Sequence, residues 1–153
     1  MNKTFLVIAV LFLFFGCAGR DYSHPVPREN IAILQSGIYL EYDSVWKPLD
    51  IQVDAAISCT INYLKAELAA GRDDPNHGVS NILKEITNYR FQVIPVVEDG
   101  KQFIYLNCSN KNMEFPDWRT QITFVFDGGY WFWMIKYDVE KDKCLDLRIN
   151  GYA

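Results

Sequence analysis

The hydrophobic pattern divides the chain into an apolar N-terminal run, a helical middle and a strand-rich C-terminal half. The apolar run covers residues 5–15 without a charged or turn-forming residue. Between residues 48 and 70 apolar side chains recur every three or four positions, which indicates one face of an α-helix. From Tyr89 onward they fall into short runs separated by turn residues, which indicates β-strands. The chain therefore predicts helices first and a sheet second.

The strongest strand signal lies in residues 121–137, with the sequence QITFVFDGGYWFWMIKY. Its DGG triplet at 127–129 stands between two aromatic and β-branched runs, which is the pattern of a tight hairpin turn. We expect this hairpin to form the centre of an antiparallel sheet. A two-residue turn puts Trp133 on the face of Phe124 and Phe126, and a three-residue turn reverses that choice.

The helical middle predicts one long helix over residues 48–70. Pro48 suits its first turn and Gly71 the position just after its end. Its apolar face consists of Val53, Ile57, Ile61, Leu64 and Leu68. A shorter helix is expected over residues 79–88, and another could begin at Pro27 and run to Leu34.

The other strands are expected around the hairpin. Residues 90–97 contain Pro95, which cannot donate a ladder hydrogen bond, so this segment predicts an edge strand or a bulge. Residues 102–108 return after a tight turn at 98–101. Residues 144–150 alternate most clearly, so we expect the core face of that strand to carry Leu145, Leu147 and Ile149.

This order of elements predicts an α+β domain, with a long helix and a short helix packed on a four- to five-stranded antiparallel meander. Over about residues 48–153 it resembles the cystatin-like folds and their nuclear-transport-factor-like relatives, in which a sheet wraps a helix. The resemblance implies an architecture only, because such folds host many unrelated functions.

The N-terminal apolar run is too short for a permanent membrane span. A helix of its length reaches about 16 Å, against a bilayer core of about 30 Å. With Lys3 ahead of it, the run is typical of a secretory signal peptide. The segment Phe14-Phe15-Gly16-Cys17-Ala18 follows, and its Gly16-Cys17 resembles the lipobox of bacterial lipoproteins.

The lipobox resemblance implies a signal peptide of residues 1–16 and a Cys17 carrying acyl chains such as palmitate. The prolines, glycine and polar residues that follow predict a flexible tether over 17–30, and the remaining length predicts a single domain over 31–153. Ala18 in place of an aspartate implies the outer membrane, facing the periplasm, in a diderm host. The sequence departs from the pattern at Phe14, where leucine is usual, and at Phe15, where a smaller residue is usual. Ordinary cleavage after Gly19 is the alternative, and it predicts a secreted protein.

Composition and motifs argue against several classes of function. The chain has 15 Lys and Arg, 19 Asp and Glu and a formal charge of −4, which gives no electrostatic basis for nucleic-acid binding. Residues 71–78 contain acids, an asparagine and His77, but their spacing fits neither a calcium loop nor a zinc site. We expect no metal, no cofactor and no catalytic site. His24, in the predicted tether, is expected to be an exposed spacer residue.

The cysteines allow at most one intrachain disulfide once Cys17 is lipidated, because Cys59, Cys108 and Cys144 then remain. Cys108 ends one predicted strand and Cys144 begins another at the same end of the sheet, so this pair is favoured. Two intervening strands would separate the pair by roughly 14 Å, which is too far without strong curling. Buried, unpaired thiols are the alternative.

Aromatic residues provide the candidate binding surface, for which we select Trp118, Tyr130 and Phe132. The alternative is that these rings fill the core. The sequence therefore predicts a membrane-tethered lipoprotein of the cell envelope whose domain binds a protein or small ligand and is not an enzyme. The alternatives are an inhibitor or immunity-type protein and a small carboxylate-dependent hydrolase.

Overall fold

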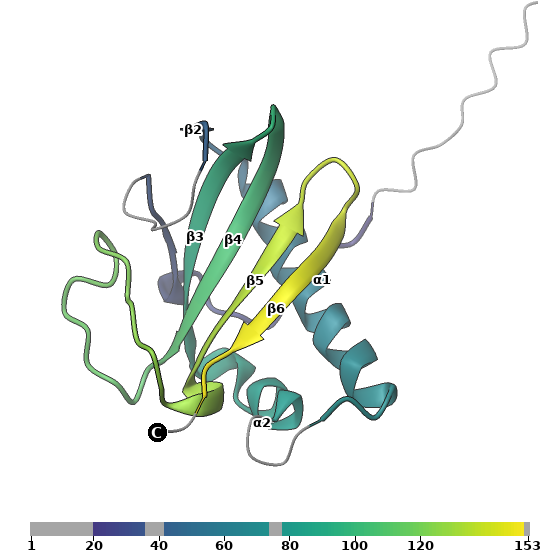
Figure 1. Cartoon of the computed structure of the whole chain (residues 1–153), viewed down its shortest axis with the longest axis vertical. Coiled ribbons are helices and arrows are strands. Elements are labelled where there is room, and N and C mark those ends of the chain that lie inside the picture. The colour runs from purple at the N-terminus through teal and green to yellow at the C-terminus, as the bar shows by residue number, and fades with distance from the viewer. Residues whose placement is uncertain (1–19, 36–41, 74–77, 152–153) are drawn as a thin grey trace, which may run out of the picture.

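The computed structural model describes residues 20–35, 42–73 and 78–151 as an α+β domain (Figure 1). Two α-helices accompany one six-stranded sheet. In chain order the elements are η1 (Arg28–Asn30), β1 (Ile31–Ile33), β2 (Ser44–Val45), α1 (Asp50–Ala69), α2 (Val79–Lys84), η2 (Ile86–Asn88), β3 (Tyr89–Glu98), β4 (Lys101–Asn110), η3 (Gly129–Trp131), β5 (Phe132–Asp138) and β6 (Lys143–Ile149).

The sheet is mixed rather than wholly antiparallel. Its strand order is β1-β3-β4-β5-β6, with β2 also paired to β3. Strands β3 to β6 are antiparallel neighbours, whereas β1 runs parallel to β3. The helix expected from Pro27 to Leu34 is wrong, because the chain makes one turn of 3₁₀-helix and then extends along β3. Leu34 continues this contact by donating its N–H to the Val93 carbonyl at 2.9 Å.

Pro95 lies inside the sheet at a point where no partner strand needs its missing N–H. On that edge of β3, strand β1 pairs with residues 91–93 and strand β2 with Val96 and Val97. Pro95 therefore falls in the gap between two short strands. The prediction of an edge strand is wrong for β3 as a whole, because this strand has partners on both sides. At Pro95 itself the prediction is correct, because no strand pairs with this residue on the side of β1 and β2.

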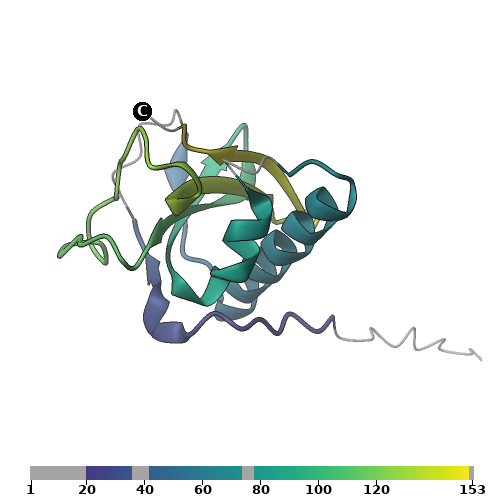
Figure 2. The same ribbon diagram turned by 90° about the horizontal axis from the view of Figure 1, so that it is seen from below.

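The core lies between α1, α2 and one face of the sheet (Figure 2). The predicted long helix is confirmed, and Val53, Ile57, Ile61 and Leu64 are buried as expected. On the sheet side Trp133 is buried and makes edge-to-face contacts with Tyr89 and Phe91, at centroid distances of 5.5 and 5.8 Å. We call this helix-covered face of the sheet the inner face.

The hairpin expected over residues 121–137 does not form. Residues 121–127 have no regular secondary structure, and β5 pairs with β4 and β6. Both edges of β5 are thereby occupied, so the residues before the DGG triplet cannot pair with it. Gly128 (φ 89°) instead begins the turn η3, and its Phe132 neighbour lies so close that an added Cβ would meet the ring at 2.7 Å.

A bulge in β6 changes which of its side chains reach the core. The pairing shifts between Met134 and Lys136 of β5, opposite Asp146, which has φ 55°. One extra residue reverses the alternation beyond it. Leu147 and Ile149 pack on the core as predicted, but the prediction for Leu145 is wrong, because Cys144 takes the inner-face position.

The predicted tether is packed against the domain from Arg20 onward, and Figure 2 shows this purple segment running beside α1. Val26 is buried in the core. His24 is not an exposed spacer: its side chain is 5% exposed, and its Nε2 lies 3.1 Å from Asp54 Oδ1 on α1. Apolar burial and this contact bind the segment to the helix. Cys17 lies outside the described residues.

Candidate functional site: an aromatic loop on the outer face of the sheet

A long segment without regular structure crosses the outer face of the sheet, the face away from α1. We call it the aromatic loop and define it as residues 111–128, between β4 and η3. Figures 1 and 2 both show this green segment on the side of the sheet opposite α1. Ile122 of the loop packs on a second apolar cluster formed by Leu34, Ile94 and Val96. The loop therefore covers part of a second, smaller core.

Gln92 of β3 holds the loop from beneath. This side chain is 1% exposed, and all of its described polar contacts run to the loop and to β4. Its Nε2 donates to the carbonyls of Trp118 at 2.5 Å and Gln121 at 2.6 Å. Its Oε1 accepts from the Thr123 N–H at 2.8 Å. A strand normally satisfies such backbone groups through a neighbouring strand, and here a side-chain amide replaces it.

Two asparagines complete the attachment. Asn107 of β4 donates from Nδ2 both to Gln92 Oε1 and to the Thr123 carbonyl, each at 2.8 Å. Asn150, just after β6, donates to the carbonyls of Val125 at 2.6 Å and Asp127 at 3.0 Å. Three amide side chains, from β3, β4 and the end of β6, therefore fix the path of the loop.

This fixed path holds two phenylalanine rings in solvent. Phe124 is 55% exposed and Phe126 is 84% exposed. Their rings are in edge-to-face contact, with centroids 4.7 Å apart and an interplanar angle of 84°. In an extended segment residues i and i+2 point the same way, so both rings leave the loop on one side. Two large apolar rings kept together in water are a recurrent feature of interaction surfaces.

A groove of about 290 Å³ adjoins the ring pair. Its apolar lining comes from Ile122, Phe124, Val125, Phe132, Trp133 and Met134, and polar groups are supplied by Asn107, Thr123, Arg148 and Asn150. A cavity of about 150 Å³ holds one benzene molecule, so this groove has room for about two such rings. It is smaller than most pockets for drug-sized ligands, which span about 300–1,000 Å³.

The three aromatic residues selected from the sequence do not form one surface. Trp118 is a half-buried part of the aromatic loop, with the Arg119 guanidinium 4.5 Å from its ring centroid. Phe132 is buried beneath the loop and meets Phe115 edge to face at 5.9 Å. Tyr130 packs on the inner core, and its carbonyl accepts the Tyr89 hydroxyl at 2.7 Å. Only Phe132 of these three lines the groove.

A second hollow, of about 600 Å³, lies between α1 and the β5–β6 turn. It is lined by Arg20, Asp21, Tyr22, Ser58, Cys59, Asn62, Tyr63, Asp142, Lys143 and Cys144. Asp142 accepts hydrogen bonds from the Tyr22 hydroxyl at 3.2 Å and the Tyr137 hydroxyl at 2.8 Å, and it forms an ion pair with Arg20. These contacts attach the N-terminal segment to the β5–β6 turn.

The favoured disulfide between Cys108 and Cys144 is wrong, because the two residues lie far apart in the sheet. Cys108 is opposite Trp133 of β5 and Cys144 is opposite Tyr137, four residues further along the same strand. With β5 between them, the offset is roughly 13 Å along the strand alone, well beyond disulfide reach. Cys108 is buried, and that burial raises the pKa of its thiol well above the usual range.

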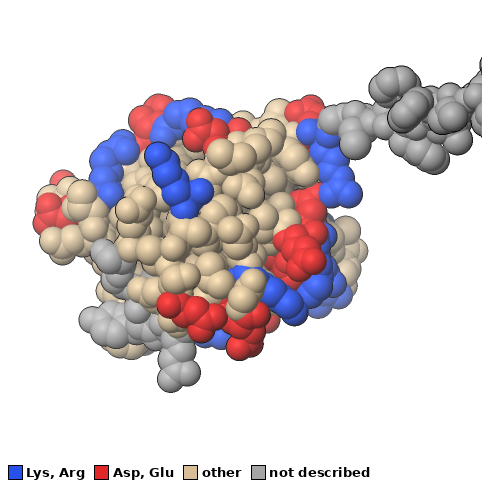
Figure 3. All heavy atoms as spheres, turned by 90° about the horizontal axis from the view of Figure 1, so that it is seen from above, with Lys and Arg blue, Asp and Glu red and all other residues tan. Residues whose placement is uncertain are grey.

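Charge is mixed on the molecular surface. Figure 3 shows acidic and basic side chains interspersed around an uncharged centre on the face it presents. In the described ranges no group of three or more histidine, cysteine, aspartate or glutamate side chains is placed to hold a metal ion. Over the same residues no helix combines the length and apolarity needed to cross a bilayer.

Comparison with protein-family models, with curated proteins and with solved structures gave no match to this chain.

Proposed function

We propose that this protein is a lipid-anchored protein of the cell envelope that acts by binding a protein partner. The partner inserts one or two apolar side chains into the groove beside Phe124 and Phe126. The observation that carries the proposal is the exposed ring pair, which the amide side chains beneath the loop hold next to an apolar groove with room for about two such rings. Aromatic side chains placed beside a pocket are typical centres of protein interfaces.

The size of the groove favours a protein partner over a small molecule. A free ligand of two-ring size would leave most of Phe126 in water, because that ring is 84% exposed and lies on the loop surface. A polypeptide covers both rings while one of its side chains enters the groove. Arg148 and Asn150 at the groove provide donors for backbone carbonyls or a carboxylate of the partner.

The anchor proposal rests on the lipobox-like Gly16-Cys17. From Cys17 to Arg20, where the packed segment begins, the chain advances three residues, a reach of at most about 11 Å. A lipidated Cys17 would therefore keep the domain against the headgroups. Arg20 joins the β5–β6 turn through Asp142, on the side away from the aromatic loop (Figure 1). The ring pair would then face away from the membrane. In a diderm host it would project from the outer membrane into the periplasm.

We keep the cystatin-like architecture as part of this proposal. It is supported by the long helix α1 packed on the antiparallel strands β3 to β6, and the parallel strand β1 is an addition to that plan.

Chemical crosslinking in intact envelopes tests the binding proposal. An affinity-tagged full-length protein is crosslinked in the cells that produce it, and its adducts are compared with those of the double variant Phe124→Ser/Phe126→Ser. The matched control is Ile51→Ser, because Ile51 is an apolar side chain of α1 with the similar exposure of 54%. We expect one protein adduct that the double variant loses and the control retains. Identical adducts in all three proteins would contradict the proposal.

A further inference from the structure

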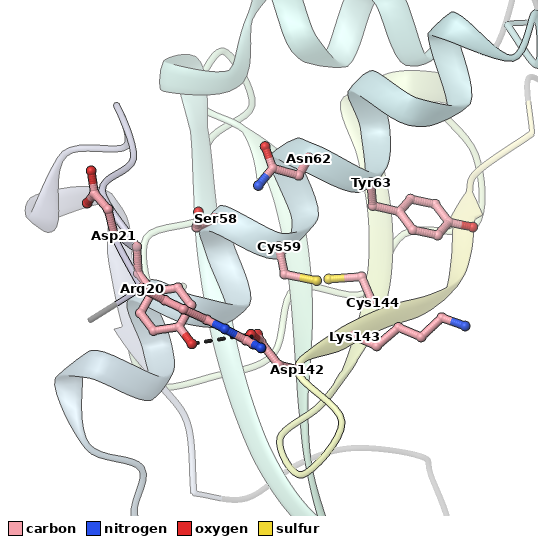
Figure 4. A pocket seen from close by; sticks show the side chains of 10 residues that line it. Arg20, Asp21, Ser58, Cys59, Asn62, Tyr63, Asp142, Lys143 and Cys144 are labelled. Atoms are coloured by element: carbon pink, nitrogen blue, oxygen red, sulfur yellow. Dashed lines mark hydrogen bonds and ion pairs between the residues drawn. The ribbon is translucent and has the colours of Figure 1, made fainter. Parts of the chain in front are cut away.

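Cys59 and Cys144 face one another across the contact between α1 and β6. Cys59 lies in the middle of α1 and Cys144 is the second residue of β6. Figure 4 shows the two sulfur atoms pointing toward each other from the two elements. The two thiols interact strongly enough for each to shift the pKa of the other. No local sequence pattern links a residue of a helix to a residue of a distant strand, so the sequence alone does not predict this pair.

The surroundings of Cys144 hold its sulfur in this position. Cys144 is buried, and its Sγ lies 3.6 Å from the Thr60 hydroxyl and 3.9 Å from the Ala56 carbonyl oxygen. Thr60 is itself fixed, because its hydroxyl donates to that same carbonyl at 2.8 Å. Cys144 is therefore aimed at α1 by contacts with two residues of that helix.

Cys59 is the thiol that a reagent can reach. It is half-buried and, together with Cys144, lines the hollow of about 600 Å³ beside Tyr63 and Asn62. The volume of that hollow lies within the range of about 300–1,000 Å³ that is typical of small-molecule sites. Cys108, the third described cysteine, is buried and far from both. The pair thus combines one accessible sulfur with one sheltered sulfur.

The interaction shifts the pKa values of the two thiols in opposite directions. Donation from the Cys144 thiol stabilises the thiolate of Cys59 and lowers the pKa of Cys59, against the opposing effect of partial burial. The same interaction, together with burial, raises the pKa of Cys144. A thiolate is the attacking species in disulfide exchange, so Cys59 is the nucleophile of the pair.

We propose that Cys59 and Cys144 form a reversible disulfide that links α1 to β6, by exchange with a disulfide-bearing oxidant such as a thiol–disulfide oxidoreductase. The Cys59 thiolate attacks one sulfur of the oxidant's disulfide. That S–S bond breaks, one oxidant thiolate leaves, and a mixed disulfide forms on Cys59. Cys144 gives up its proton to solvent and attacks the Cys59 sulfur. The second oxidant thiolate then leaves, so two cysteines are oxidised and one disulfide is reduced to two thiols.

Oxidised glutathione is the probe that tests this proposal. The reduced full-length protein is incubated with it, quenched with acid, alkylated under denaturing conditions and analysed as tryptic peptides by mass spectrometry. We expect a peptide pair joined through Cys59 and Cys144, lost on treatment with dithiothreitol, and an alkylated Cys108. The crosslink closes a long loop, so the oxidised protein should melt about 10 °C or more above the reduced protein.

Single variants separate the two roles. In Cys144→Ser the exchange should stop at a stable glutathione adduct on Cys59, whereas Cys59→Ser should leave Cys144 unmodified in the folded protein. The matched control Cys108→Ser should keep the Cys59–Cys144 link. The proposal is overturned if the folded wild-type protein keeps both Cys59 and Cys144 as free thiols after treatment, or if the links involve Cys108 equally. The wild-type result tests the proposal even if a serine variant fails to fold.

Discussion

Gln92 and Asn107 are hydrogen-bonded to each other across β3 and β4, with 2.8 Å between Asn107 Nδ2 and Gln92 Oε1. Both side chains also bind the backbone of the aromatic loop, so the pair ties that loop to the sheet. Buried polar groups are costly when left unpaired, so this arrangement commits the loop to one path. The exposed positions of Phe124 and Phe126 follow from that path.

Replacing Gln92 with leucine should loosen the aromatic loop without unfolding the sheet. The substitution leaves the Thr123 N–H and the Trp118 and Gln121 carbonyls without their side-chain partner. We expect the free energy of unfolding to fall by about 3 kcal/mol or more, because each of the three unpaired groups costs roughly 1–3 kcal/mol. Urea denaturation measures this loss. Hydrogen exchange at the Thr123 amide should become faster.

The matched control for that variant is Gln121→Leu, because the Gln121 side chain is exposed. It should change the free energy of unfolding by less than about 0.5 kcal/mol. Equal effects of the two substitutions, or an unchanged exchange rate at Thr123, would show that Gln92 does not hold the loop.

Substitutions of the exposed phenylalanines around the groove should change the free energy of unfolding much less than substitution of the buried one. Phe124→Ser and Phe126→Ser should each change the free energy of unfolding by no more than about 0.5–1 kcal/mol, because their rings lie largely in water. Phe132→Ala removes a buried ring and should cost about 3 kcal/mol or more. Thermal or urea unfolding measures both. A large loss of stability from Phe126→Ser would mean that this ring supports the fold rather than a partner.

The reactivity of Cys59 should extend to lower pH than that of an ordinary thiol. The hydrogen bond from Cys144 lowers the pKa of Cys59, so more thiolate is present at neutral pH. Iodoacetamide alkylation of the folded, reduced protein, followed by peptide mass spectrometry, gives the pH profile. In Cys144→Ala the donor is lost, the pKa of Cys59 should rise, and the profile should move to higher pH. An unchanged profile in that variant would contradict the assignment.

Membrane attachment should depend on Cys17. Cys17→Ser removes the acylated sulfur implied by the lipobox resemblance, so the protein should move from the membrane fraction to the soluble fraction. Mass spectrometry of the wild-type N-terminus should find an acylated cysteine at position 17. Unchanged membrane retention of the variant, with an unmodified wild-type N-terminus, would refute the anchor.

The helix α1 was predictable because its apolar period of three to four residues is local and long. The prediction of a central hairpin is wrong for a non-local reason. Phe124 and Phe126 alternate with polar and smaller residues as in a strand, but β4 and β6 occupy both edges of β5. Local sequence does not reveal which edges are free. The backbone there is satisfied by Gln92, Asn107 and Asn150, which are distant in sequence.

The candidate sites, like the hairpin, depend on contacts between residues that are distant in sequence. Ile94 and Val96 of β3 lie on the second face of the sheet, where Leu34 and Ile122 pack against them. Which aromatics stay exposed depended on the path of the loop, so Trp118, Tyr130 and Phe132 were selected in place of Phe124 and Phe126. The Cys59–Cys144 contact was hidden because a bulge at Asp146 accompanies the inward position of Cys144.

Site-specific photocrosslinking from position 126 tests the central claim most directly. A benzoylphenylalanine replaces Phe126 in the full-length protein, and the control carries it at Glu140, an exposed position in the β5–β6 turn on the other side of the molecule. After irradiation of intact cells we predict one protein adduct from position 126, absent from position 140 and lost when Phe124→Ser is added. No adduct from position 126, or the same adducts from both positions, would contradict a partner docked on the aromatic loop.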